Sequence, residues 1–503
     1  MAIKKYLADK DNTITNGFGI NLSTRQTGSN MGAADILEVH SIYGQQTSAS
    51  VELSRVLVQF PVTKISADRA ANVIPASGSV SFFLRMFNAR HSEQLPRDFT
   101  LNVLAVSQSW EEGRGLDMES YSDESSNIIE GSNWMSASKT AAWGKVGGDY
   151  HSASYVPGNG STMPNYTFTF ADGDEDMLLD VTSAVEEWIA NSQPNYGFGV
   201  FLTASQEGYV SSSSGLDEDP ILHNAEGAQK SFYTKRFFSR SSEFFFKKPS
   251  IEARWDSTVK DDRGYFFASS SMAPGADNKN NLYLYNYIRG RLVDIPHSET
   301  VTVKLYASSD SAPVGSSLAQ ATATKFSTGV YKAQLVINTT SSLLHDVWSG
   351  SVGGVYKTGS ITVNKFNDSS VLLADDYTQF ISKITNLKKS YSKNEQARFR
   401  VFTRPRNFTP TIYTKASQNV QNVVIPSGSY EVIRVIDNET VINNSTGSTT
   451  QHTYMSYDNS GSYFDLDMSL LEPGYMYAIK LQFYSSENWR EQEELFKFRV
   501  ENN

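Results

Sequence analysis

Short runs of alternating side chains recur along this 503-residue chain, and they limit what it can fold into more than any other feature. Residues 56–60 place one set of hydrophobic side chains at positions 56, 58 and 60, and the same period of two recurs at 301–306, 479–483 and 496–500. This period puts every second side chain on the core face of a β-sheet. The pattern therefore predicts an all-β protein, and it predicts that the strand at 56–60 is half buried.

One segment departs from this period. Within 181–190, hydrophobic residues stand at positions 181, 184, 185, 188 and 189, which is the spacing of one helix face. Asp180 and Thr182 are candidate N-caps, and the sequence at 183–186 matches a capping box. We therefore predict one short helix, held against the sheets by Trp188.

The chain is too long for a single hydrophobic core, and at roughly 150 residues per domain it divides into about three. The first predicted domain spans 1–258. Strand spacing predicts an immunoglobulin-like β-sandwich at 259–375 and another, of the immunoglobulin or fibronectin type III kind, at 376–503. In the last domain, the sequence before Tyr477 resembles the turn-then-tyrosine element of such domains, in which the hydroxyl bonds back across a corner.

A set of motifs lies between Ser54 and Phe201. The motifs are 54–60, Ser109-Trp110-Glu111-Glu112-Gly113, Trp143 with 147–150, Asp180-Val181-Thr182, Trp188 and 195–198. Their order and spacing resemble the DNRLRE-type jelly-roll modules of secreted and surface-exposed proteins, a non-catalytic family related in fold to carbohydrate-binding sandwiches. The resemblance implies a jelly-roll-like sandwich for the first domain, with a binding or scaffolding role.

The tryptophans of these motifs have two interpretations. Trp110, Trp143 and Trp188 could stack on sugars, but a buried indole more often fills a core and donates its N–H to a nearby carbonyl. We therefore predict that all three are structural residues.

Composition excludes several classes of partner. Lys and Arg total 44 against 54 Asp and Glu, so the formal charge of −10 provides no general attraction to nucleic acid or to an anionic membrane. Cysteine is absent, which excludes disulfides, thiolate metal sites and a cysteine nucleophile. No window approaches the ~20 apolar residues of a transmembrane helix, and the N-terminus lacks a signal-peptide pattern. We expect synthesis in a cytoplasm without export by the usual route.

Catalytic patterns are missing as well. Glu111 and Glu112 are adjacent, so on a strand they point to opposite faces and cannot flank one glycosidic bond. The sequence also lacks a Gly-x-Ser-x-Gly elbow, a phosphate-binding Gly-x-x-x-x-Gly-Lys loop and paired metal-ligating histidines. We predict that the protein is not an enzyme.

An extracellular type of module without an export signal suggests a virus particle, whose parts assemble in the host cytoplasm and act outside after lysis. The chain, beginning with 9–16 and 28–32, resembles virion structural proteins of tailed bacteriophages. This resemblance implies a non-enzymatic component of the tail, neck or collar, or a decoration protein. It also implies that the chain forms a homo-oligomer and binds other virion proteins. The alternative is an adsorption module that binds host-surface carbohydrate.

Two groups of polar residues are candidate sites. The cluster Lys235, Arg236, Lys247 and Lys248 alternates with aromatic residues, a pattern that occurs in strand pairs with outward charges and in single-stranded nucleic-acid sites. It also suits docking of an acidic neighbouring subunit. Related jelly rolls often hold a structural calcium, for which the candidates are Asp9, Asp11 and Asp180. The acidic run at 172–176 lacks the glutamate that closes a calcium loop, so we interpret it as a solvated turn, and no other cofactor is expected.

Overall fold

The computed structural model divides into two compact units, which we call the N-terminal unit (2–255) and the C-terminal unit (256–503). It describes residues 2–43, 51–91, 96–117, 131–151, 163–209, 224–296, 300–307, 316–352, 354–364, 379–406, 412, 422–447, 451–485 and 488–502. The division falls between Trp255 and Asp256, beside the predicted boundary at 258.

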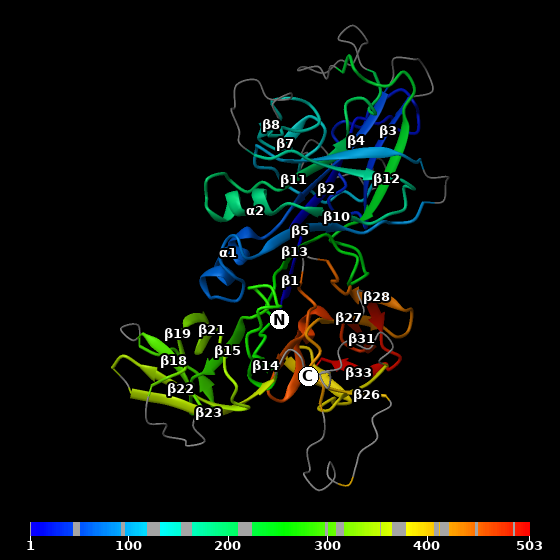
Figure 1. Cartoon of the computed structure of the whole chain (residues 1–503). Helices are drawn as coiled ribbons and strands as arrows, with labels where there is room; N and C mark the ends of the chain where they lie inside the picture. The colour runs from blue at the N-terminus through cyan, green and yellow to red at the C-terminus, as the bar shows by residue number, and fades with distance from the viewer. Residues whose placement is uncertain are drawn as a thin grey trace. The chain divides into compact units, whose positions relative to one another are not determined.

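The described part of the N-terminal unit is built on two main antiparallel sheets, which we call the small sheet and the large sheet (Figure 1). The small sheet has the order β1 (Ile3–Leu7), β13 (Ser250–Arg254), β5 (Ser81–Met86) and β10 (Met177–Asp180). The large sheet has the order β12 (Phe232–Phe238), β3 (Ile36–Tyr43), β4 (Val51–Gln59), β11 (Phe198–Leu202), β6 (Phe99–Ala105) and β9 (Tyr166–Phe170), with β2 (Lys10–Thr15) also paired to β4.

The first and last strands of the unit close the small sheet. Ile3 of β1 pairs with Arg254 of β13, and the register continues to Leu7 opposite Ser250. Strands far apart in sequence are likewise neighbours in the large sheet, where β11 lies between β4 and β6. The chain therefore crosses between two facing sheets, which is the arrangement of a jelly-roll-like sandwich.

Hydrophobic cores lie on both faces of the large sheet. One core fills the space between the sheets and includes Val56 and Val58, while the other covers the outer face and includes Leu57. All three side chains are fully buried. The prediction that the strand at 56–60 is half buried was therefore wrong, because the segment after β6 folds back over the outer face of the sheet and buries that side too. This segment also contains the small hairpin of β7 (Ser136–Ser138) and β8 (Ala141–Ala142).

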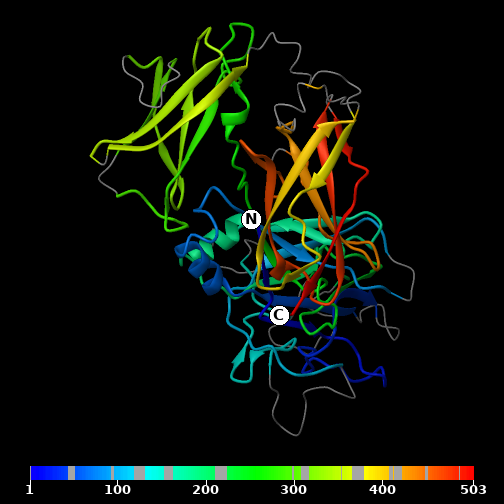
Figure 2. The ribbon, with the colours of Figure 1, turned by 90° about the horizontal axis from the view of Figure 1, so that it is seen from below.

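The predicted helix is present as α2 (Thr182–Ile189), and the described residues contain a second helix, α1 (Val62–Ala70). Figures 1 and 2 show the two helices side by side. Arg69 of α1 forms a bidentate ion pair with Glu186 of α2 at 2.6 and 2.7 Å. Glu186 therefore joins the helices instead of closing a capping box, and Asp180 accepts the backbone N–H of Thr182 at 2.9 Å.

The C-terminal unit begins with a middle sandwich. Its described sheets have the orders β14-β23-β22-β18-β19 and β15-β21-β20, with a separate hairpin of β16 and β17. The strands are β14 (Phe266–Phe267), β15 (Asn280–Tyr285), β16 (Tyr287–Ile288), β17 (Arg291–Leu292), β18 (Val301–Tyr306), β19 (Ala319–Thr322), β20 (Thr324–Ser327), β21 (Val330–Leu335), β22 (Leu343–Gly350) and β23 (Gly354–Asn364), preceded by the 3-10 turn η1 (Asp262–Gly264).

A C-terminal sandwich follows. Its described sheets have the orders β24-β26-β30-β29 and β25-β33-β31-β27-β28, with β32 paired to β31. The elements are β24 (Phe380–Ile384), β25 (Ser390–Ser392), β26 (Gln396–Pro405), β27 (Gly428–Arg434), β28 (Glu439–Ile442), β29 (Ser456–Asp458), β30 (Gly461–Asp467), the 3-10 turn η2 (Met468–Leu470), β31 (Met476–Ser485), β32 (Asn488–Glu491) and β33 (Phe496–Glu501).

The tyrosine corner lies in this last sandwich. Tyr477 is fully buried, and its hydroxyl donates a 2.8 Å hydrogen bond to the backbone carbonyl of Glu472, five residues earlier. That is the bond expected from the turn-then-tyrosine sequence.

The fold class is all-β, with 6% helix and 47% strand. It consists of a jelly-roll-like sandwich and two immunoglobulin-like sandwiches, and it differs from the prediction by the additional helix α1. None of the helices in the described ranges has the length and hydrophobicity to cross a membrane.

Candidate interaction surface

The three predicted structural tryptophans are buried in the N-terminal unit. Trp110, Trp143 and Trp188 are each 2–3% exposed. The indole N–H of Trp110 donates to the carbonyl of Tyr196 at 2.8 Å, and that of Trp143 donates to the carbonyl of Asn133 at 2.8 Å. Trp188 packs against Phe198 with ring centroids 4.8 Å apart. None of the three presents a face on which a sugar could stack.

A buried ion pair lies in the core on the outer face of the large sheet. Arg55 of β4 is 1% exposed, and its guanidinium contacts both carboxylate oxygens of Glu207 at 3.2–3.3 Å. The guanidinium also lies 4.7–5.9 Å from the ring centroids of Trp134, Tyr150 and Phe201. Burial raises the pKa of Glu207, whereas the charge of Arg55 lowers it, and burial has the larger effect.

Sequence analysis missed this pair, although a charged residue inside the alternating run of β4 was a signal for it. A lone arginine at a core position needs a buried acid as partner. The partner, however, lies 152 residues away in sequence, and only the folded chain identifies it.

The predicted basic strip is not a continuous exposed surface. Lys235 is 1% exposed, and its ammonium donates hydrogen bonds of 2.8 Å to the Asn88 side chain and to the carbonyls of Gly173 and Glu175. It also lies 4.5 Å from the ring centroid of Phe170. Burial lowers the pKa of Lys235 to about 8. Successive side chains of β12 point to opposite faces of the sheet, and Lys235 faces inward. Lys235 is therefore a structural residue and cannot contact a neighbouring subunit.

The other members of the cluster are partly neutralised or covered. Arg236 points to the opposite side of β12 and pairs with Glu38 at 3.0 Å. The ammonium of Lys247 lies 5.1 Å from the Phe87 ring, and Lys248 is close enough to Asp11 to lower its pKa. Both lysines are half-buried. The prediction of one basic docking strip is therefore corrected, because Lys235 is buried and Arg236 is ion-paired on the opposite side of β12.

The three calcium candidates do not meet at one site. Asp180 accepts the N–H and hydroxyl of Thr182 at the start of α2. Asp11 accepts the backbone N–H of Arg240 at 2.6 Å, and Asp9 lies two residues before it in sequence. In the described parts of the chain, no group of three or more Asp, Glu, His or Cys residues has an arrangement that could hold a metal ion.

Glu112, one of the two adjacent glutamates, belongs to the network around Asp11. It accepts the backbone N–H of Asp11 at 2.9 Å and forms a bidentate ion pair with Arg240 at 2.5 and 2.6 Å. Glu111 is exposed beside it. The two carboxylates therefore lie in different surroundings, one ion-paired and one exposed, and do not form a catalytic pair.

Asp11 leads to a prediction about pH. The residue is 1% exposed, and burial together with the Glu112 carboxylate raises its pKa to about 7, above the roughly 3.9 of an unfolded chain. The folded state then binds the proton more tightly, so this group adds stability as the pH falls through 7 towards 4. We expect the midpoint of thermal unfolding to increase between pH 8 and pH 5.5, and Asp11→Asn to reduce that increase.

The control is Asp174→Asn, which changes an exposed carboxyl in the same unit. Scanning calorimetry at both pH values provides the measurement. An equal pH response in the wild type and the Asp11→Asn variant would contradict the assignment.

The acidic run at 172–176 is a turn whose three aspartates are exposed to solvent, as interpreted from the sequence, and whose glutamate binds the backbone of the turn. Glu175 accepts the backbone N–H groups of Ala171, Asp172 and Gly173 at 2.7–2.8 Å. Partial burial raises the pKa of Glu175, but these hydrogen bonds to the carboxylate outweigh burial. The pKa of Glu175 is therefore below its usual value. The turn presents its carbonyls to Lys235, which explains why that lysine is buried.

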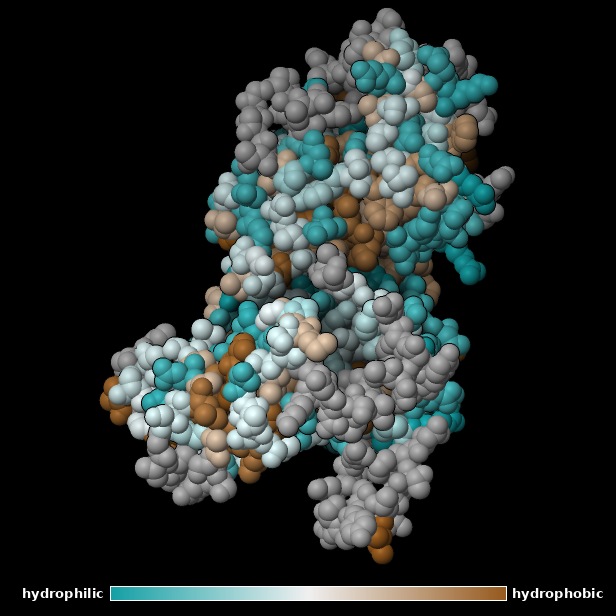
Figure 3. Space-filling view, viewed as in Figure 1, coloured by the Kyte–Doolittle hydropathy of each residue, from teal (hydrophilic) through white to brown (hydrophobic). Residues whose placement is uncertain are grey.

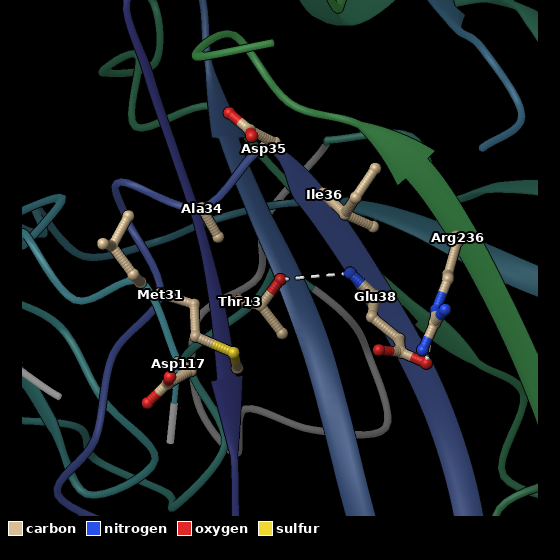
Figure 4. Close-up of a pocket in the computed structure, with 9 residues that line it drawn as sticks. Thr13, Met31, Ala34, Asp35, Ile36, Glu38, Asp117 and Arg236 are labelled. Carbon is tan, nitrogen blue, oxygen red and sulfur yellow. Dashed lines mark hydrogen bonds and ion pairs between the residues drawn. The ribbon is translucent and has the colours of Figure 1, made fainter. Parts of the chain in front are cut away.

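An open groove of about 590 Å³ lies on the outer side of β3. Figure 4 shows Met31 and Asp117 on one side of it, with the ion-paired Glu38 and Arg236 on the other. The backbone N–H of Glu38 donates to the hydroxyl of Thr13 at 3.1 Å. The lining residues are Thr13, Met31, Ala34, Asp35, Ile36, Glu38, Leu116, Asp117 and Arg236. The groove thus combines hydrophobic side chains with an excess of carboxylates.

Comparison with known proteins identifies no family for the chain. No family model matches it, and no curated protein matches it. Solved structures with similarity include titin immunoglobulin tandem domains (10% identity, 40% of this chain and 80% of that chain, TM-score 0.15). The adhesin InvE of Yersinia pseudotuberculosis is 11% identical, over 44% of this chain and 54% of that chain, with a TM-score of 0.15.

A third structure is that of the chicken CNTN1 FN1–FN3 domains, which is 9% identical over 54% of this chain and 82% of that chain, with a TM-score of 0.15. TM-scores this low carry no argument, so the fold assignment depends on the sheets described above. None of these three structures is named as a phage or DNRLRE-type protein.

Proposed function

We propose that this chain is a non-enzymatic structural subunit that works by binding other protein subunits of an assembled particle. The observation that carries the proposal is that the tryptophans and charged residues of the motif region bind other parts of the same chain. The tryptophans of the motif region are buried, Glu112 is paired with Arg240, and Arg55 is paired with Glu207. These groups stabilise a sandwich and are not arranged around a substrate.

Exposed hydrophobic residues support a protein partner. Phe232 of the edge strand β12 is 65% exposed and pairs directly with Ile42 of β3, which is 38% exposed. On the face shown in Figure 3, hydrophobic side chains also lie among polar ones over the middle sandwich. Contiguous exposed hydrophobic residues with a polar surround are characteristic of protein contacts.

The resemblance in the motif region and at the N-terminus supports a role in the virion of a tailed bacteriophage, as a tail, neck, collar or decoration protein. The chain would assemble there after synthesis in the host cytoplasm. Several copies arranged symmetrically would be consistent with the prevalence of closed homo-oligomers.

The test measures the amount of this chain relative to the other structural proteins in phage particles from lysates of the infected host. The particles are purified by density banding and washed with salt. We expect the chain to remain on the particles at a constant ratio to the other structural proteins. Its loss during washing would contradict the proposal, as would release of reducing ends when the purified chain is incubated with polysaccharides.

A glycan array separates the proposal from the carbohydrate alternative. We expect the intact purified chain to bind no glycan on the array, because the indoles that could stack on a sugar are buried. Reproducible glycan binding by the intact chain, together with its absence from washed particles, would favour the adsorption module instead.

A further inference from the structure

The side chains of Lys235 and Asn88 are in contact inside the N-terminal unit. Nζ of Lys235 lies 2.8 Å from Oδ1 of Asn88. A carbonyl bond is about 1.2 Å long, so this hydrogen bond places Nζ roughly 3–4 Å from the carbonyl carbon Cγ of Asn88. Reacting atoms in a near-attack geometry are about 3–3.5 Å apart. The lysine nitrogen is therefore within reach of an electrophilic carbon.

Aromatic rings and burial favour the reactive form of this lysine. Lys235 is 1% exposed, and its Nζ lies 4.5 Å from the ring centroid of Phe170 and 5.3 Å from that of Phe237. Burial lowers the pKa of Lys235 to about 8. An exposed lysine has a pKa of about 10.4 and is almost fully protonated at neutral pH. Lys235 therefore has a larger fraction of uncharged amine, which is the nucleophilic form.

Two backbone carbonyls orient the amine. The carbonyl oxygens of Gly173 and Glu175 each accept a hydrogen bond of 2.8 Å from Nζ of Lys235. An uncharged amine has two N–H groups and one lone pair. When the two carbonyls accept both N–H groups, the lone pair is left on the side of Asn88. The turn at 173–175 thus fixes the nitrogen in an orientation suited to attack on the amide carbon.

The amide partner is also held in place. Asn88 follows β5, and its backbone pairs with Phe237 of β12 in an antiparallel bridge. Ala89, the next residue, donates its backbone N–H to the carbonyl of Arg236 at 3.0 Å. The backbone N–H of Asn88 donates to the carboxylate of Asp176 at 2.8 Å. Because both reacting groups are fixed by the fold, little freedom remains to be lost on the way to the transition state.

We propose that Lys235 and Asn88 join in an intramolecular isopeptide bond. The uncharged Nζ of Lys235 attacks Cγ of Asn88, so that a bond forms between Nζ and Cγ and the bond between Cγ and Nδ2 breaks. One proton passes from Nζ to the departing Nδ2, which leaves as ammonia. The reaction balances without an oxidant, a cofactor or a second protein. The amide product keeps one N–H on Nζ, which the carbonyl of Gly173 or Glu175 can accept.

The bond would connect the two sheets of the N-terminal unit. Asn88 follows a strand of the small sheet, Lys235 belongs to a strand of the large sheet, and the two residues are 147 positions apart in sequence. The chain has no cysteine, so a disulfide cannot provide such a link. A cross-link that closes a long loop stabilises a fold largely by restricting the unfolded chain. Because the reaction needs no partner, the bond should form in the isolated chain as well as in an assembled particle.

The test is the mass of the intact purified chain, followed by tandem mass spectrometry of its tryptic peptides. We expect the wild type to weigh one ammonia molecule less than the mass calculated from its sequence. Trypsin should release the segments 86–90 and 231–236 as one branched peptide, joined through Asn88 and Lys235. Asn88→Ala should have the full calculated mass and release no branched peptide.

A matched control is Lys230→Arg, which changes an exposed lysine just before β12. It should lose ammonia as the wild type does. A wild type whose mass equals that of the unmodified sequence, even after incubation at pH 9, would overturn the inference. A loss of ammonia that persists in Asn88→Ala would overturn it as well, because the ammonia would then come from another residue.

A second variant keeps the buried charge but removes the nucleophile. Lys235→Arg retains a cation that can donate to the carbonyls of Gly173 and Glu175, whereas its guanidinium stays protonated and cannot attack an amide. We expect this variant to have its full calculated mass and to release no branched peptide. A mass lower by one ammonia molecule in Lys235→Arg would contradict the assignment. The branched peptide of the wild type decides the question even where a variant fails to fold.

Discussion

Glu252→Gln should destabilise the N-terminal unit by about 3–5 kcal/mol, the typical cost of removing one partner from a buried ion pair. Glu252 of β13 is fully buried, and its carboxylate contacts Lys5 at 3.2 Å, Arg85 at 3.4 Å and Arg254 at 2.5 Å. Burial alone would raise the pKa of Glu252, but the three cations outweigh it and hold the pKa well below its usual range. Without the charge of Glu252, three cations lie together with no anion between them.

Urea unfolding followed by tryptophan fluorescence measures this loss. Five of the seven tryptophans belong to the N-terminal unit, so the signal reports mainly on that unit. The control is Glu226→Gln, which changes an exposed glutamate of the same unit. If Glu252→Gln lowers the free energy of unfolding no more than Glu226→Gln does, the carboxylate of Glu252 does not hold strands β1, β5 and β13 together.

The same variant has a distinct pH response. Because the folded pKa of Glu252 is depressed, its stabilisation is fully present above the unfolded value of about 4.3 and is lost as the pH falls below it. The difference in stability between the wild type and Glu252→Gln should therefore shrink between pH 6 and pH 3. A constant difference over that range would contradict the assigned pKa shift.

Arg55→Met is expected to cost about 3–5 kcal/mol, because it leaves Glu207 buried without its partner. Arg55→Lys should also destabilise the unit, since an ammonium cannot reproduce the two contacts to Glu207 or the packing of the planar guanidinium against Phe201. The double variant Arg55→Met/Glu207→Met should recover most of the loss, because a buried ion pair can often be replaced by hydrophobic residues at little cost.

The double-mutant cycle is measured by the same urea unfolding. A large coupling free energy between Arg55 and Glu207 is the expected result. Additive losses would instead show that Arg55 acts through its packing with the aromatic rings and not through the carboxylate.

Local patterns predicted the elements whose determinants are close in sequence. The helix appears at Thr182–Ile189, where four hydrophobic residues share one face that Val181 extends at the N-cap. The hydroxyl of Tyr477 reaches a carbonyl only five residues away, so a short turn motif was sufficient to indicate it. Helix α1 was missed because its pattern is weak, since only Val62 and Ile65 of its nine residues are buried.

The candidate sites were harder to predict than the fold. Lys235 lies in a basic, aromatic run that resembles an exposed strip, but its three hydrogen-bond acceptors come from segments 60 to 147 residues away. Nothing in the local sequence shows that a turn at 173–175 will supply carbonyls to its ammonium. The acidic groove is likewise assembled from β2, β3, β12 and the segments around Met31 and Leu116, which no single motif contains.

The alternation of hydrophobic side chains and the absence of cysteine by themselves determined that this chain is a packed β-protein without disulfide bonds. Tertiary structure decided which side chains are accessible. A strand pattern specifies two faces but does not specify what covers each of them, because burial depends on segments far away in sequence. That is why Val56 and Leu57 are both buried, and why Arg55, Lys235 and Glu252 are bound to partners inside the protein while the carboxylates of the groove remain at its surface.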